Sequence, residues 1–115
     1  VVDGILYLGH DKPITKISLE YLKDRHRHLW IHLKNFGAAD YFAGNVDFNY
    51  FAHENDPYVI TSKGYVWSYP GKCKAQHKVV LMPEWGAEDS SSGAVGICTD
   101  FPVKYQFLVS GSVQK

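Results

Sequence analysis

Several short polar segments directly follow apolar runs of the sequence. Their side chains are of the types that serve in catalysis and in ligand binding. The segments are His10-Asp11, Lys34-Asn35, His53-Glu54, Thr61-Ser62, Glu84 and Asp100. Histidines and carboxylates transfer protons, and lysine binds anions. In parallel α/β folds the carboxyl ends of the strands carry the site, so this pattern predicts a rim of functional groups at one end of a sheet. The alternative is simpler, because strands must end and polar residues commonly follow them.

The elements that would position this rim are short strands and helices. The predicted strands cover residues 5–8, 29–33, 47–51, 58–61, 65–67, 79–82 and 94–98. Several are continuous apolar runs, which are typical of parallel strands buried on both faces. Ser18 is the predicted cap of a helix over 19–25, a brief helix over 38–43 ends at Gly44, and Asp100 caps a last helix. A strand over 105–109 is the alternative for that last segment, and 88–93 reads as a polar loop.

Composition restricts the function classes. The chain has 115 residues, of which 45% are hydrophobic and 21% charged, so it is expected to fold as a single domain over 1–115. Twelve basic and twelve acidic residues give a net charge of zero without a basic stripe, which disfavours nucleic acid as a partner. No apolar run is long enough for a membrane span, and no signal peptide is visible. Cys73 and Cys98 fit neither a zinc spacing nor a disulfide scaffold, which favours a reduced, cytoplasmic setting.

Five segments resemble, in the same order, those of the glycerophosphodiester phosphodiesterase family. They are LYLGHDKP (6–13), WIHLKN (30–35), TSKGYVWSYPGK (61–72), VLMPEW (80–85) and GICTDF (96–101). The resemblance extends over roughly residues 4 to 102. It implies a phosphatidylinositol-phospholipase-C-like barrel, and hence an α/β fold: a partial or truncated TIM-type (β/α) barrel with mainly parallel strands and short helices. The strands that open this family's barrel, with a first catalytic histidine and two metal carboxylates, have no counterpart in the chain.

The resemblance also implies roles for individual residues. His10 matches the second catalytic histidine of the family, and Lys34 would face a phosphate. Asp11 and Glu54 are the candidate ligands of a divalent cation, Mg²⁺ or Ca²⁺. The candidate substrate-binding residues are His32, His53 and Trp67. His32 stands where the wider superfamily has a glutamate, which puts a metal ligand at that position in doubt.

Several of these residues, and Asp100 as well, also have an ordinary structural interpretation. His10 could end a strand and hydrogen-bond a loop, and Lys34 could be a solvated surface lysine. Trp67 is expected in the core more than on a substrate, and Asp100 as a helix cap more than as a catalytic acid. His32 and Lys34 alternate along one strand, so both should face the same side.

Three functions are consistent with the sequence. The first is a divergent or truncated phosphodiesterase-like domain that is catalytically incomplete alone and binds a small phosphodiester. The second is an active, metal-dependent phosphoric diester hydrolase whose site is completed by a second copy in a homo-oligomer. The third is a non-enzymatic binding or assembly module on the same scaffold, which would use exposed strand edges and aromatic side chains as an interface.

Overall fold

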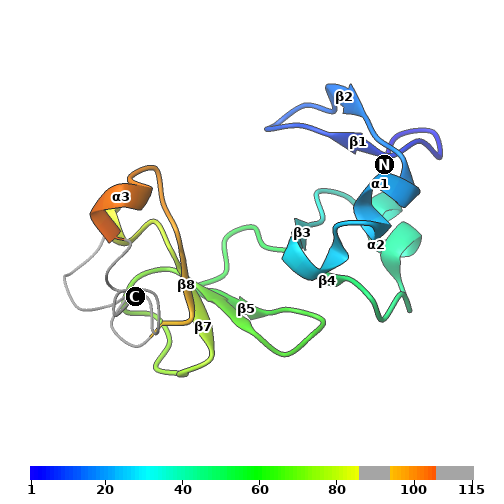
Figure 1. Ribbon diagram of the computed structural model, residues 1–115. Coiled ribbons are helices and arrows are strands. Elements are labelled where there is room, and N and C mark those ends of the chain that lie inside the picture. Colours follow the sequence, from blue (N-terminus) through cyan, green and yellow to red (C-terminus); the bar gives the residue numbers. More distant parts are fainter. Residues whose placement is uncertain (86–93, 106–115) are drawn as a thin grey trace. The chain divides into compact units, whose positions relative to one another are not determined.

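The chain forms two compact units, Val1–Ala52 and His53–Lys115, and each is described by itself. The computed structural model describes residues 1–85 and 94–105 (Figure 1). The predicted loop over 88–93 and most of the alternative strand over 105–109 therefore lie outside the described residues. Within the described part of the chain, no helix has both the length and the apolar character that crossing a membrane requires.

The Val1–Ala52 unit combines a hairpin with a β-α-β segment. Strands β1 (Tyr7–Leu8) and β2 (Thr15–Lys16) pair antiparallel, and two short helices, α1 (Leu19–Lys23) and η1 (His26–His28), follow. Strand β3 (Trp30–His32) then pairs parallel with β4 (Asn49–Phe51), and α2 (Phe36–Phe42) lies between them in the sequence. A parallel pair needs such a crossover connection, which the 33–48 segment supplies.

Local side-chain bonds explain where both α-helices begin. The hydroxyl of Ser18 accepts a hydrogen bond from the Tyr21 N–H at 3.1 Å, which confirms the predicted cap of α1. The Asn35 side chain caps α2 in the same way, accepting from the Ala38 N–H at 2.9 Å. Gly44 follows α2 with φ +75°, a conformation that glycine adopts without strain. The helix therefore begins earlier than the sequence predicted, at the residue after Asn35.

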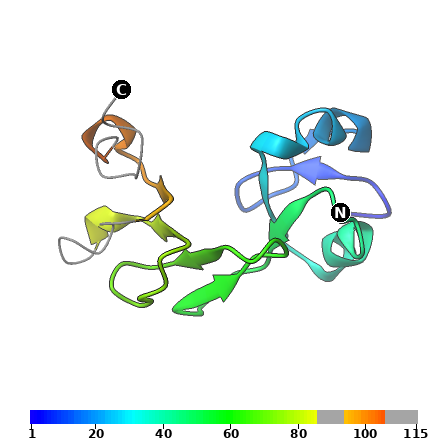
Figure 2. The same cartoon turned by 60° about the horizontal axis from the view of Figure 1, so that its bottom comes forward.

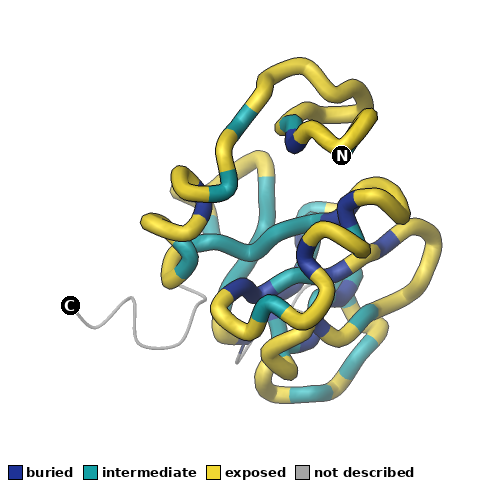
Figure 3. The backbone as a smooth tube through the Cα atoms, turned by 90° about the vertical axis from the view of Figure 1, so that its right-hand side faces the viewer, coloured by how far each residue is buried: buried dark blue, intermediate teal, exposed yellow. Residues whose placement is uncertain are grey.

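The core of this unit packs both helices against the strands and their flanks. Figure 3 shows the buried stretches in dark blue. Phe42 and Phe48 are each only 1% exposed, and their rings meet edge to face at 5.2 Å between centroids. Such aromatic pairs add to the free energy of burial alone. The other buried members of the cluster are Leu6, Leu22, Leu33 and Ala38.

The His53–Lys115 unit is built on one four-stranded sheet. Its strands are β5 (Tyr58–Ile60), β6 (Val66–Ser68), β7 (Lys78–Leu81) and β8 (Gly96–Cys98), in that spatial order. Strands β5 and β6 form an antiparallel hairpin, which Figure 2 shows in green, whereas β6, β7 and β8 run parallel. Two short helices complete the described residues, η2 (Pro83–Trp85) and α3 (Pro102–Tyr105).

The expected partial TIM-type barrel is wrong. The described strands form three separate sheets of two, two and four strands, and two of these contain antiparallel pairs. A (β/α) barrel places a helix after each strand. Here Gly64, with φ +87°, turns β5 straight back into β6, and 69–77 joins β6 to β7 without a helix. The unpredicted strand β2 likewise turns the chain back along β1.

Candidate functional site

A tight turn between β1 and β2 carries three of the polar side chains. Gly9 has no room for a side chain, because a Cβ atom there would clash with the Lys12 carbonyl oxygen. Asp11 adopts φ +69°, a left-handed conformation that aspartate tolerates better than most residues. The turn closes with a hydrogen bond from the Ile14 N–H to the Leu8 carbonyl at 3.0 Å. Backbone geometry therefore fixes the positions of Asp11 and Lys12.

The end of β3 supplies the next side chains. Lys34 is exposed just after the strand. The side-chain amide of the next residue, Asn35, makes hydrogen bonds through both its oxygen and its nitrogen. The Asn35 Oδ1 atom caps α2, while its Nδ2 atom donates to the Val1 carbonyl at 2.9 Å. The helix cap thus fixes the backbone next to Lys34.

These two segments meet around one cavity of about 340 Å³, which we call the polar cavity. It brings together Asp11 and Lys34, which are 23 positions apart, and adds Lys12 and Asn35. Two lysines and one aspartate give its charged side chains a net charge of +1 at neutral pH. The remaining lining residues are Val1, Val2, Tyr7, Gly9 and Pro13. Sequence reasoning missed Lys12, although it lies inside the same polar segment as Asp11.

His10 lies outside this lining. Its side chain is 97% exposed, and its Nδ1 atom is 3.0 Å from the Asp11 Oδ2 atom. The predicted catalytic pair of His10 and Lys34 therefore does not share the cavity: Lys34 lines it, whereas His10 contacts Asp11 outside the lining. The catalytic role of His10 stays a prediction.

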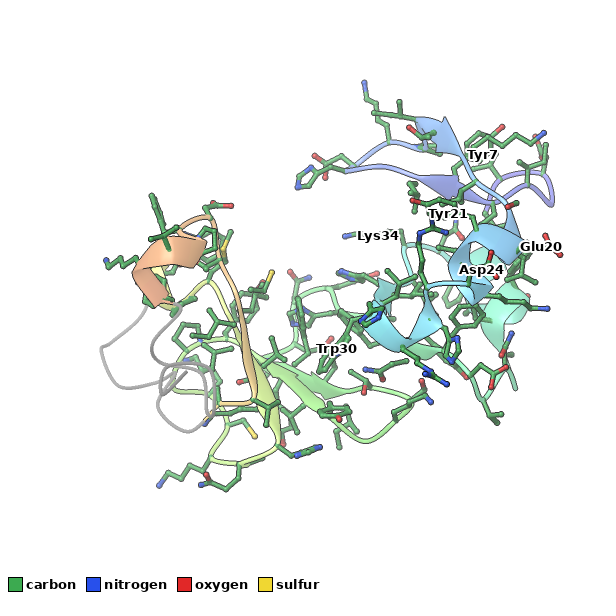
Figure 4. The ribbon with its side chains drawn as sticks, in the orientation of Figure 1. Tyr7, Glu20, Tyr21, Asp24, Trp30 and Lys34 are labelled. Carbon is green, nitrogen blue, oxygen red and sulfur yellow. The ribbon has the colours of Figure 1, made fainter. Side chains whose placement is uncertain are left out.

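A second cavity in the same unit, of about 390 Å³, is mainly apolar, and we call it the apolar cavity. Both His32 and Lys34 line it, together with the residues between and before them, so the expectation that the two share one side of the strand stays a prediction. The His32 ring also stacks on Phe51 of β4, with centroids 4.8 Å apart. Figure 4 shows four of the lining residues, which come from β1, α1, β3 and the segment after β3: Tyr7, Tyr21, Trp30 and Lys34.

The other predicted site residues belong to the His53–Lys115 unit. His53 is buried, its Nε2 atom donates to the Asp56 carbonyl at 2.7 Å, and its ring lies 5.1 Å from that of Tyr69. These contacts place His53 in the loop before β5, and its substrate-binding role stays a prediction. Trp67 is half-buried in β6, where it pairs with Val79 of β7, and Glu54 is exposed. Neither Glu54 nor Trp67 lines the two cavities of the other unit.

The polar residues after β7 and β8 form a cluster of their own. Glu84 accepts hydrogen bonds from the Thr99 hydroxyl at 2.6 Å and from the Asp100 N–H at 3.3 Å. Partial burial acts to raise the pKa of Glu84, but these hydrogen bonds outweigh it and hold the pKa below its ordinary value. Burial raises the pKa of the neighbouring Cys98 thiol, as do the charges of Asp100 and Glu84. Sequence reasoning named Glu84 and Asp100 but missed Thr99, whose hydroxyl donates to the Glu84 carboxylate.

The side chains that line the polar cavity do not provide the ligands that a divalent cation needs. Mg²⁺ and Ca²⁺ require several oxygen ligands, of which carboxylates are the strongest. Only Asp11 lines the cavity as a carboxylate, two ammonium groups share the space, and Glu54 is not part of it. Among the described residues there is also no group of three or more histidine, cysteine, aspartate or glutamate side chains with the arrangement of a metal site.

Comparisons of the chain with protein-family models, curated proteins and solved structures find no match. The resemblance to glycerophosphodiester phosphodiesterases therefore stays a prediction that rests on the five sequence segments. The geometry of the polar cavity is an observation that does not depend on this resemblance.

Proposed function

We propose that the Val1–Ala52 unit binds a small organic phosphodiester in the polar cavity. The observation that carries this proposal is the net charge of +1 that Lys12, Lys34 and Asp11 give to a cavity of about 340 Å³. A phosphodiester group carries one negative charge, which is opposite in sign and equal in size to the net charge of the cavity. The volume lies at the lower end of the range for small-molecule sites.

The roles of the two lysines follow from their chemistry. An ammonium group donates three hydrogen bonds and attracts phosphoryl oxygens as a point charge. Lys12 and Lys34 come from different segments, so they can approach the phosphate from two directions. Asp11 lowers the net charge of the cavity to +1, which is equal in size to the single negative charge of a phosphodiester group.

We propose further that the chain is a divergent phosphodiesterase-like protein whose catalysis is incomplete in a single copy. General acid–base hydrolysis needs proton donors and acceptors within hydrogen-bonding reach of the reacting oxygens. The support for incompleteness is that His10 is directed to Asp11 outside the cavity lining, and no histidine is among the residues that line it.

The test is a titration of the full chain with glycerophosphocholine and with glycerol 3-phosphate, measured by calorimetry without metal. We expect the diester to bind, and Lys34→Gln or Lys12→Gln to weaken it about 10-fold each, the effect of losing one charge-assisted hydrogen bond. Lys63→Gln, an exposed lysine of the other unit, is the matched control. Equal affinity of the Lys34→Gln variant and the original chain would remove the basis of the proposal.

A second candidate is an active enzyme or an assembly module that works as a homo-oligomer. The observation that favours it is β5, an edge strand of its sheet on which Tyr58 and Ile60 are both exposed. An exposed apolar edge strand pairs readily with a second chain. Light scattering of the pure chain decides between a monomer and an oligomer, and Ile60→Lys should dissociate an oligomer that uses this edge.

The hypothesis of a metal-dependent phosphoric diester hydrolase has a separate test. Hydrolysis of bis(p-nitrophenyl) phosphate that requires Mg²⁺ or Ca²⁺, and that His10→Ala abolishes, would replace the binding proposal with an enzyme. A monomeric mass together with no turnover would leave ligand binding as the function.

We also propose a cytoplasmic setting for the protein. The support is that Cys73 and Cys98 are both free thiols, which a reducing compartment maintains. Fractionation of cells that express the tagged chain tests this, and recovery in a secreted fraction would overturn it.

A further inference from the structure

The apolar cavity of the Val1–Ala52 unit is a second binding site candidate, separate from the phosphodiester proposal. Its inner wall includes four core residues, Leu6, Leu22, Leu33 and Phe42, which are all buried. Its volume of about 390 Å³ is near the lower end for small-ligand sites, so it suits one slender apolar group and not a bulky ligand. Apolar cavities of this kind are poorly hydrated, which favours entry of an apolar ligand.

The charged side chains that line this cavity are of one sign. Arg25 and Lys34 line it, and no carboxylate is among its lining residues. An apolar chamber that carries two cationic side chains matches a ligand with an apolar body and an anionic head.

Arg25 is already oriented for such a head group. Its guanidinium carbon lies 3.7 Å from the centre of the Tyr21 ring, and its Nη1 atom donates to the Tyr21 carbonyl at 3.0 Å. These two contacts with Tyr21 fix the orientation of the guanidinium group. They use one of its N–H donors, and further donors remain for a ligand. A guanidinium fork matches the two oxygens of a carboxylate.

We propose that the apolar cavity binds a single straight-chain alkyl carboxylate of medium length. The chain packs on Leu22, Leu33 and Phe42, and the carboxylate pairs with Arg25, with Lys34 as a second cation. The polar cavity shares Val1, Tyr7 and Lys34 with this site, but Arg25 belongs to the apolar cavity and Lys12 to the polar one.

The experiment is a calorimetric titration of the full chain with decanoate below its micelle concentration. Butanoate has the same head group and six fewer methylene groups, and it should bind at least about 100-fold more weakly, since each buried methylene contributes to affinity. Decyltrimethylammonium has the same chain length with the opposite charge, and it should bind at least about 10-fold more weakly than decanoate.

Matched variants locate the head group. Arg25→Gln should weaken decanoate about 10-fold or more, the effect of losing a charge-assisted pair, and should leave glycerophosphocholine binding unchanged. Arg27→Gln removes an exposed arginine that lies outside both cavities, and it should change neither affinity. Lys12→Gln should weaken only the phosphodiester, so the two proposals can fail separately.

Three results would overturn the proposal. One is equal affinity for decanoate and decyltrimethylammonium, which would mean unspecific apolar adsorption. Another is decanoate binding that Arg25→Gln and Arg27→Gln reduce equally. The absence of decanoate binding to a chain with native circular dichroism would overturn it as well.

Discussion

Both units contain the same sequence pattern, a short strand followed by polar residues, but the structure that these polar residues form differs between the units. In Val1–Ala52 the polar side chains after β1 and β3 surround a cavity, and Lys12 and Lys34 are exposed there. In His53–Lys115 the polar residues after β7 and β8 bond to each other, as Glu84 does with Thr99. The pattern alone therefore predicts polar groups near strand ends, but it does not tell an open site from a structural cluster.

The difference follows from strand pairing. Strands β7 and β8 are neighbours in one parallel sheet, with Leu81 opposite Cys98, and the Met82 N–H donates to the Cys98 carbonyl at 2.7 Å. Residues just beyond both strands are therefore close enough for direct hydrogen bonds. Strands β1 and β3 belong to different sheets, so the segments that follow them remain apart and leave a cavity between them.

The largest expected effect concerns the core behind the cavities. Phe42→Ala removes a ring that is 1% exposed and packs on Phe48, and it should cost about 3–5 kcal/mol of unfolding free energy. Phe36→Ala, in the same helix, is the control, since Phe36 is 91% exposed and its loss should change stability by less than about 0.5 kcal/mol. Urea denaturation measures both. Similar losses in the two variants would mean that the cavity unit lacks the packed core described above.

An intermediate effect is expected at the turn that carries Asp11 and Lys12. Gly9→Ala places a methyl group against the Lys12 carbonyl, so the turn must open, at a cost of about 1–3 kcal/mol. The variant should also lose phosphodiester affinity, because Lys12 moves with the turn. Gly37→Ala in α2 is the control, since its new methyl group has ordinary contacts and alanine favours the helix. Calorimetric binding that survives in Gly9→Ala would show that the turn does not position the ligand.

The sequence predicts a helix start or a turn correctly where a single residue determines its position. Ser18 marks the start of α1, and Gly64 the turn between β5 and β6, because side-chain capping and positive φ depend on few neighbours. The arrangement of sheets was not predictable in this way. Strand β2 is only two residues long and exposed, so it leaves no apolar run to detect, and without it the antiparallel β1–β2 pair is invisible.

The candidate site was predictable in part for the same reason. The predicted polar rim placed Asp11 and Lys34 at one end of a single sheet, whereas the polar cavity contains both although they follow strands of two different sheets. The involvement of Lys12 depends on the left-handed Asp11 and the close approach at Gly9, which are properties of the folded turn. The contacts of His53 with Asp56 and Tyr69 likewise depend on how a loop closes, so the sequence could not separate a ligand-binding histidine from a structural one.

The smallest expected effect tests the structural cluster of the second unit through pH. The pKa of Glu84 is held below its ordinary value of 4.5, so its carboxylate stabilises the fold above that pH. This contribution is lost as the pH falls through the lowered pKa, because the protonated group no longer accepts the Thr99 and Asp100 hydrogen bonds as strongly. Glu84→Gln should therefore be slightly less stable at pH 7 and should lose less stability on acidification.

Thermal unfolding between pH 7 and pH 3 measures this difference. Glu54→Gln is the matched control, because Glu54 is an exposed carboxylate of the same unit and is not part of the Glu84 cluster. If Glu84→Gln and Glu54→Gln lose stability in parallel with the original chain, the Glu84 hydrogen bonds do not stabilise the fold. The carboxylate would then be available for a ligand, and the distinction between an open site in one unit and a structural cluster in the other would no longer hold.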